Sequence, residues 1–249
     1  MKRSDLLVIG GFILILLPFF LFRPVYDGYS WFNLNHGYIT SFIKFAILAT
    51  FGESIGLRIR EGVYAKPGFG FLPRALVWGV IGMMIKAAFV IFAGSAPALL
   101  ASVGITGADP QILRQPEFSW IKLLTAFTGS AMMNIYFAPM FMTAHKISDL
   151  HIMDTGGTLK GFFSPINIGR NFSRIDWMVM WNFVFKKTLI FFWIPAQTLN
   201  FMLPEAYRVL FAAVLSIILG ILLSLANTFK KKKNDTAHRD VQVENLSVS

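Results

Sequence analysis

Charged and amide side chains inside apolar segments are the residues of this chain best placed to do chemistry. Lys44, Glu53 and Lys86 lie within or beside long apolar runs, and Asn134 lies in another. A charge near the centre of a bilayer costs at least about 2.5–3.5 kcal/mol on insertion scales, so such residues usually face a bundle interior or a water-filled cavity. These four residues are therefore our candidates for lining a pore.

Lys44 and Lys86 are predicted to share a depth in the membrane. At 1.5 Å per residue, Lys44 lies roughly 20 Å from Arg58, and Lys86 lies roughly 18 Å from Arg74 on an antiparallel helix. Glu53 would lie on the opposite face of the helix from Lys44, so we expect neither lysine to have an acid beside it. Two inward-facing lysines would form a positive constriction that favours anions. In the alternative, each lysine is buried against carbonyl groups or snorkels to the interface.

A second polar group lies in the stretch WIPAQTLNFMLPEAYR, residues 193–208. Its spacings of 4, 3, 4 and 4 residues place five side chains on one stripe of a continuous helix: Trp193, Gln197, Asn200, Pro204 and Arg208. Pro195 frees a backbone carbonyl one turn earlier, and we expect a neighbouring donor to satisfy that carbonyl. The stripe is predicted either to hold helices together or to line a pore.

Small residues at intervals of four predict close helix packing. Gly52 and Gly56 form one pair, and the last apolar segment carries Ser216, Gly220 and Ser224 on one face. Small side chains at this spacing let helix backbones approach one another closely.

The sequence offers little for catalysis or for a cofactor. The segment HKISDLHIMD contains His145, Asp149, His151 and Asp154, but a metal site needs more convergent ligands than this spacing gives. Nucleotide-binding loops, zinc-protease motifs and nucleophile elbows are all missing, and the absence of cysteine removes thiol chemistry. We predict that the protein is not an enzyme, with no catalytic residues, no metal and no cofactor.

The elements that hold these residues are predicted to be membrane helices. Hydrophobic residues make up 55% of the 249-residue chain and charged residues only 14%, which is typical of an integral membrane protein. The chain is predicted to be all-α, a polytopic helix bundle over residues 1–229 followed by a basic, then disordered tail over 230–249. Six apolar windows predict the spans: 6–22, 38–57, 75–93, 120–143, 188–203 and 207–226. Residues 175–187 either extend the fifth span or lie in the interface.

Basic residues indicate the orientation of these spans. Placing both termini in the cytoplasm puts 15 lysines and arginines on that side and three on the other. The fifteen are Lys2, Arg3, Arg58, Arg60, Lys66, Arg74, Lys146, Lys160, Arg170, Arg174, Lys230, Lys231, Lys232, Lys233 and Arg239, and the three are Arg23, Arg114 and Arg208. The run Lys230–Lys233 is predicted to touch anionic lipid headgroups rather than nucleic acid.

The stretch 193–208 resembles a signature of the small peroxisomal membrane protein family, which includes a mitochondrial inner-membrane channel. Six residues fall on that signature, together with a closing Leu223-Ser224: Trp193, Gln197, Asn200, Phe201, Pro204 and Arg208. Upstream, Glu53 stands where the family has an aspartate, and Asn134 where it has a glutamine. The resemblance, which covers roughly residues 38–226, implies a membrane channel. The departures are Ile194 between Trp193 and Pro195, and one residue fewer before Pro204.

Two functions follow as hypotheses. The first is a pore or channel for small anionic solutes or metabolites, and the second is a non-transporting membrane scaffold or stress-related component. The partner in both is the lipid bilayer, with a homo-oligomer left open. Because no import leader or peroxisomal tail is recognisable, we expect a bacterial cytoplasmic membrane, with an organellar membrane as the alternative.

Overall fold

A computed structural model describes residues 3–221 of the chain, and every regular element among them is helical, with no strand. The prediction of an all-α protein is therefore confirmed for this part of the chain. The chain divides into two compact units, residues 1–40 and 41–249, which are described separately. Ser224, Lys230–Lys233 and the predicted tail lie outside the described residues.

The first unit contains α1 (Arg3–Leu21) and α2 (Arg23–Asn35), and the next helix begins at Gly37. Pro24 stands in the first turn of α2, where its missing N–H costs nothing. The rings of Phe19 and Tyr29 join the two helices edge to face with centroids 5.6 Å apart. The sequence did not predict α2, because its polar residues interrupt the apolar pattern.

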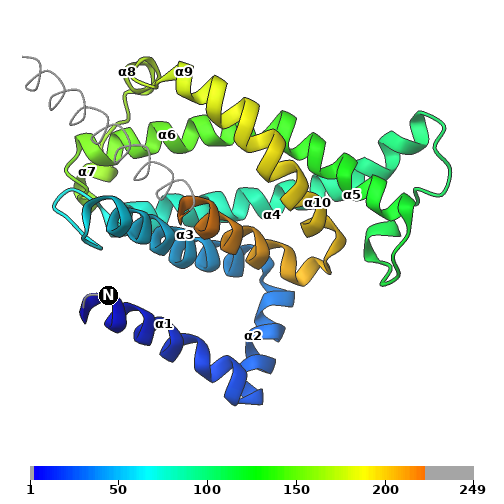
Figure 1. The fold of residues 1–249 in the computed structure, drawn as a ribbon, viewed down its shortest axis with the longest axis horizontal. Helices are drawn as coiled ribbons and strands as arrows, with labels where there is room; N and C mark the ends of the chain where they lie inside the picture. The colour runs from blue at the N-terminus through cyan, green and yellow to red at the C-terminus, as the bar shows by residue number, and fades with distance from the viewer. Residues whose placement is uncertain (1–2, 222–249) are drawn as a thin grey trace, which may run out of the picture. The chain divides into compact units, whose positions relative to one another are not determined.

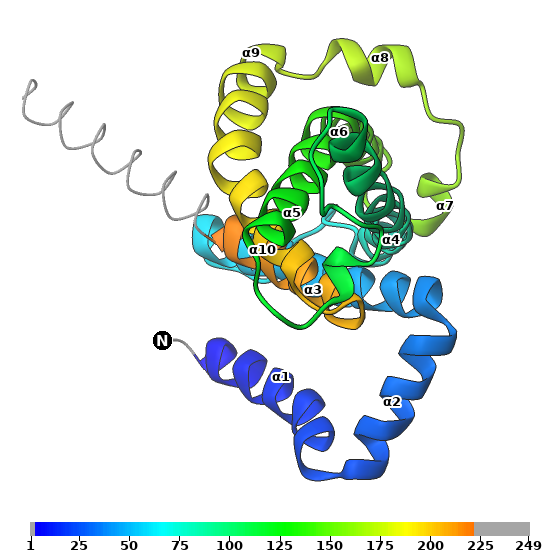
Figure 2. The same cartoon turned by 90° about the vertical axis from the view of Figure 1, so that its right-hand side faces the viewer.

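The second unit is built of long helices joined by short ones (Figures 1 and 2). Its elements are α3 (Gly37–Glu61), α4 (Phe71–Ser102), η1 (Ile112–Arg114), α5 (Trp120–Met132), the π-helix η2 (Met133–Phe137), α6 (Ala138–Asp154), α7 (Leu159–Phe162), α8 (Ile168–Ser173), α9 (Trp177–Val179), the π-helix η3 (Met180–Trp193), α10 (Ile194–Met202) and a helix over 205–221. Residues 120–154 and 177–202 are continuous helices, because their π turns join the α segments on either side. Residues 177–187 thus belong to the same helix as α10.

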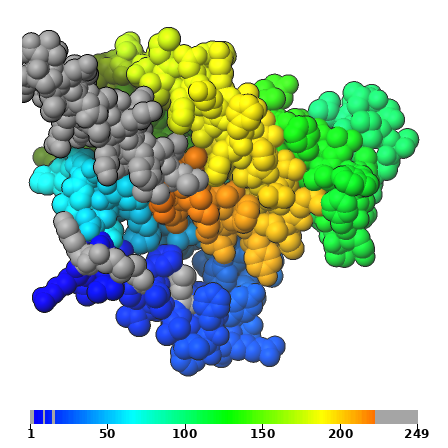
Figure 3. Space-filling model, viewed as in Figure 1, coloured from blue at the N-terminus to red at the C-terminus, as the bar shows by residue number. Residues whose placement is uncertain are grey.

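Successive long helices of this unit run antiparallel (Figure 1). The connections 62–70 and 155–176 therefore lie at one end, and the connections 103–119 and 203–204 lie at the other. The basic residues that were expected on the cytoplasmic side, from Arg58 to Arg174, belong to the first of these ends. We call it the basic end. Figure 3 shows the 177–202 helix and the 205–221 helix side by side on one face.

Two helices of the described chain are long and apolar enough to cross a membrane by length and composition, α1 and α4. Six crossings therefore stay a prediction. Of the other long helices, α3 contains Lys44, Glu53 and Arg58, and π turns divide the 120–154 and 177–202 helices into segments of at most 17 residues. Within residues 3–221, the predicted windows nevertheless fall almost entirely in long helical stretches.

The tightest helix crossing in the second unit joins α3 and α4 at two glycines of α4. A Cβ built on Gly82 would lie 2.4 Å from the carbonyl oxygen of Ser41 and 2.7 Å from the Cβ of Phe45. A Cβ on Gly79 would lie 2.4 Å from the ring of Phe42. Only glycine permits backbones to approach this closely. The sequence reasoning missed both residues as packing positions.

Candidate functional site

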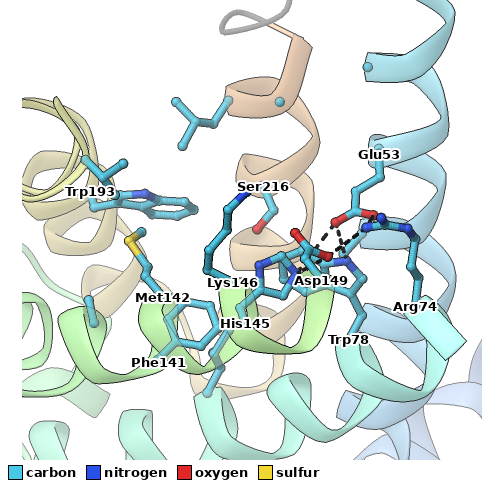
Figure 4. A pocket seen from close by; sticks show the side chains of 18 of the residues that line it. Glu53, Arg74, Trp78, Phe141, Met142, His145, Lys146, Asp149, Trp193 and Ser216 are labelled. Carbon is cyan, nitrogen blue, oxygen red and sulfur yellow. Dashed lines mark hydrogen bonds and ion pairs between the residues drawn. The ribbon is translucent and has the colours of Figure 1, made fainter. Parts of the chain in front are cut away.

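A cavity of about 590 Å³ lies inside the second unit (Figure 4). Its walls come from α3, α4, η2, α6, η3, α10 and the 205–221 helix. Its charged lining residues come from the second half of α3, the connection 62–70, the start of α4 and the later turns of α6, and they all lie towards the basic end. The remaining lining is mostly apolar. The volume falls within the range of small-molecule sites, roughly 300–1,000 Å³.

The charged part of the cavity centres on the guanidinium of Arg74. Its Nη1 donates to Glu53 Oε2 at 2.5 Å and to Asp149 Oδ1 at 2.8 Å, and its Nε donates to the carbonyl oxygen of Phe69 at 2.7 Å. Trp78 Nε1 donates to the other carboxylate oxygen of Glu53 at 3.0 Å. These residues come from three helices, so the cluster holds α3, α4 and α6 together at this end.

His145 completes the cluster. Its Nε2 lies 3.6 Å from Glu53 Oε1 and 4.0 Å from Asp149 Oδ1, and its ring lies 4.4 Å from that of Trp78. Burial acts to lower the pKa of His145, but the carboxylates of Asp149 and Glu53 outweigh that effect and hold this pKa above its ordinary value. Arg74 thus pairs with both carboxylates, and the imidazole of His145 lies beside them.

The same residues are the group among residues 3–221 that could hold a metal ion. One ligand atom each from Glu53, His145 and Asp149 lies within 4.8 Å of the others. A cation at this position would have to displace the guanidinium of Arg74, which already bonds to both carboxylates. The other two candidates of the HKISDLHIMD segment have separate roles. His151 Nε2 contacts the carbonyl oxygen of Phe162 at 3.0 Å, and Asp154 pairs with Arg174.

The part of the cavity away from the charges is lined by sulfur and aromatic side chains. Met142 and Phe141 lie beside the indole of Trp193, while Ser216 lies between Trp193 and the charged cluster (Figure 4). Trp193 Nε1 is buried and has no hydrogen-bond partner among the described residues. A buried N–H without an acceptor costs roughly 1–3 kcal/mol, so this donor calls for an explanation.

Three other members of the 193–208 stripe, Gln197, Asn200 and Arg208, form a hydrogen-bonded network where the chain reverses between α10 and the 205–221 helix. Asn200 Nδ2 donates to Gln197 Oε1 at 2.8 Å and to the carbonyl oxygen of Arg208 at 3.0 Å. Arg208 donates to three backbone carbonyls, those of Leu203, Phe201 and Leu113, at 3.0, 3.0 and 3.2 Å. These contacts favour the interpretation of this end of the stripe as packing. Pro204 stands at the reversal itself, outside both helices.

The side chains of Ser130 and Thr198 form hydrogen bonds with the backbone near Pro195. Both hydroxyls donate to the carbonyl oxygen of Ile194, each at 2.7 Å. These donors reach the carbonyl of Ile194 and not the one a turn before Pro195, so the expected donor to that carbonyl stays a prediction. No sequence pattern had singled out Ser130.

Asn134, Gln197 and the small residues line the cavity as well. Asn134 is buried in η2, where its Nδ2 donates to the carbonyl oxygen of Ser130 at 2.9 Å. A Cβ on Gly52 would lie 3.2 Å from the backbone of Ile217, and one on Gly220 would lie 4.0 Å from the carbonyl oxygen of Gly52. The Gly52 position thus packs against the last helix. Gly56, Ser216 and Gly220 form part of the cavity wall.

Lys44 and Lys86 do not line this cavity. The prediction that neither has an acid beside it is wrong for Lys86, whose Nζ donates to Glu205 Oε1 at 2.7 Å. Glu205 lies 119 residues away in the sequence, so helix geometry around Lys86 could not reveal it.

A second pocket of about 120 Å³ is lined by residues of α4, of the connection 103–119 and of the start of the 205–221 helix. Ile85 lines the large cavity, and Phe89, one turn further along α4, lines the small pocket together with Arg208. Phe89 packs against Phe201 with ring centroids 5.3 Å apart. Asn200 has a buried Oδ1 without a partner among the described residues. Its Nδ2 bonds to Gln197, which lines the large cavity, and to the backbone of Arg208, which lines the small pocket.

Comparison with protein-family models gives no match, and searches of the curated proteins and of the solved structures give none either. The resemblance of residues 193–208 to the small peroxisomal membrane protein family stays a prediction.

Proposed function

We propose that this chain is an integral membrane protein that moves small organic anions through the large cavity. In this proposal the six long helical stretches cross the bilayer, and the basic end faces the cytoplasm. The observation that carries it is the cavity itself. It is a ligand-sized space inside a helix bundle, with charged residues at one end.

The outer surface of the helices supports a membrane location. Large apolar side chains are exposed along the long helices, among them Ile91 at 60%, Tyr136 at 72%, Phe191 at 76% and Leu199 at 61%. Exposed apolar patches of this extent are rare on soluble monomers, whereas lipid accommodates them.

The charges of the cavity support an anionic solute. Four cations and three carboxylates line it: Arg60, Lys66, Arg74 and Lys146, against Glu53, Glu61 and Asp149. Lys66 pairs with Glu61 at 2.7 Å, and Arg74 pairs with Glu53 and Asp149. Lys146 is exposed at the cavity wall and can receive a negative group.

The contacts of Asn200 with Gln197 and Arg208 support a mechanism in which the cavity opens to one side at a time. In this mechanism, movement of Phe89, Phe201 and Asn200 connects the large cavity with the pocket that contains Arg208. The cationic groups at Lys44 and Lys86 lie outside the cavity, and Glu205 neutralises Lys86. We therefore place the anion preference at the basic end rather than at these two lysines.

The test is uptake of a labelled organic anion by liposomes that contain the purified protein. Ser216→Trp should fill the cavity and abolish uptake. Val214→Trp is the matched control, because Val214 lies on the same helix with 40% of its surface exposed and should leave uptake unchanged. Wild-type protein that folds, inserts and moves nothing would instead favour the scaffold.

Reporter fusions within residues 105–117 and at Ser249 should lie on opposite sides of the membrane, and the same side for both would contradict the topology.

A further inference from the structure

We infer that the cavity binds an amphipathic organic anion whose apolar body carries an oxygen acceptor, with that acceptor at Trp193 and the negative group near Lys146. This inference rests on the proposed function, because it names the solute class of the same cavity. It goes further by assigning each part of the ligand to a residue.

The unpartnered indole of Trp193 identifies the acceptor. Its Nε1 is buried and finds no acceptor among residues 3–221, and its side chain forms part of the cavity wall. A tryptophan N–H can only donate, so the group that satisfies it must be an acceptor such as a carbonyl or ether oxygen. Gln197, one helical turn further along, faces the same space.

The neighbours of Trp193 identify an apolar body. Met133, Met142 and Met180 supply thioethers to the wall, while Phe137 and Phe141 stack with ring centroids 5.8 Å apart. Methionine and aromatic side chains favour polarisable ligands and adapt to their shape. A ring system or an acyl chain meets this requirement, whereas a small inorganic anion does not.

The position of the charges fixes the orientation of the ligand. Across the cavity from Trp193 lie the charged cluster and Lys146 (Figure 4). Glu53, Arg74, His145 and Asp149 bond to one another, so their charges are largely satisfied. Lys146 is exposed on this side, and it is the group that we assign to the negative end of the ligand.

The test measures binding with a matched pair of probes, 4-benzoylbenzoate and 4-benzylbenzoate, which differ only in a ketone against a methylene. Calorimetry on the detergent-purified full chain, corrected for empty micelles, should show the ketone binding about fivefold more tightly, as expected for one net hydrogen bond. Trp193→Phe should abolish this preference, while Trp181→Phe, an exposed tryptophan on the same helix, should retain it. Equal binding of the two probes to the wild type would overturn the inference.

A second pair of variants tests the position of the ligand's negative group. Lys146→Gln should weaken binding of both acids about 1.5- to 5-fold, as for an exposed ion pair, and leave their methyl esters unaffected. Lys160→Gln, another exposed lysine at the basic end, should change nothing. An unchanged Lys146→Gln variant would refute this assignment.

Two further measurements locate the bound probe and distinguish two possible sources of the natural ligand. Near-ultraviolet light crosslinks the benzophenone to adjacent C–H bonds, so peptides containing Met133 or Met142 should carry it, and labelling confined to surface methionines would overturn the inference. A second pair, 10-oxooctadecanoate and octadecanoate, distinguishes a membrane-derived acyl chain from a ring-based solute. Ketone-selective binding without liposome uptake would refute the proposed transport alone, and uptake without ketone selectivity would refute this inference alone.

Discussion

The crossing of α3 and α4 at Gly82 leads to our most direct prediction about stability. In Gly82→Ala, the new Cβ would begin 2.4 Å from the carbonyl oxygen of Ser41 and 2.7 Å from the Cβ of Phe45. Neither atom can swing away, because one is backbone and the other is fixed to it. The two helices would have to separate by about 1 Å to restore van der Waals contact, and overpacking of this kind costs about 1–3 kcal/mol.

Gly94→Ala on the same helix is the matched control. A Cβ at Gly94 meets nothing within 4 Å, so this variant gains only the roughly 0.5–1 kcal/mol by which alanine is a better helix former than glycine. The same gain applies at Gly82 and cancels in the comparison. The difference between the two variants therefore isolates the helix contact.

Thermal unfolding in detergent, followed by circular dichroism, measures this difference. A difference of about 1–3 kcal/mol corresponds to about 2–12 °C in Tm for a chain of this size. Gly79→Ala should lie between the two variants, because the ring of Phe42 that it meets can rotate. Equal Tm values for Gly82→Ala and Gly94→Ala would show that α3 and α4 do not meet at Ser41.

Three further predictions concern the polar contacts. Arg208→Lys cannot reach the carbonyls of Leu113, Phe201 and Leu203 together and should lose about 1–3 kcal/mol of stability, whereas the exposed Arg114→Lys should match the wild type in Tm. Arg74→Gln should lose about 1.5–3 kcal/mol, and adding Glu53→Gln and Asp149→Asn should recover part of the loss in Tm; no recovery would argue against charge pairing. The hydrogen bond from Lys86 holds the pKa of Glu205 below its ordinary value, so this stabilisation is complete above about pH 4.3 and fades as the pH falls through the lower folded pKa. Glu205→Gln should therefore lose less Tm than the wild type between pH 6 and pH 3, and an identical acid profile would contradict the pairing.

The sequence alone was sufficient for the helical stretches and for the grouping of charges. Helix hydrogen bonds join residues four apart, so an apolar run of sufficient length predicts a helix without knowledge of its neighbours. The windows 38–57 and 75–93 accordingly fall inside α3 and α4. Antiparallel packing then brings Arg58 and Arg174 to the same end, as the charge bias predicted.

Tertiary structure decided what each polar residue does. Lys86 forms a hydrogen bond with Glu205, and Arg74 forms one with Asp149, which is 75 residues away in the sequence. The periodicity of a single helix cannot predict pairs that join different helices. The cavity and the free indole N–H of Trp193 depend on how the helices rotate about their axes. A rotation of one residue, 100°, would turn Trp193 away from Met142 without changing the sequence pattern. Local hydrogen bonding thus fixed the helices, while side-chain packing between distant segments fixed which of their faces form the site.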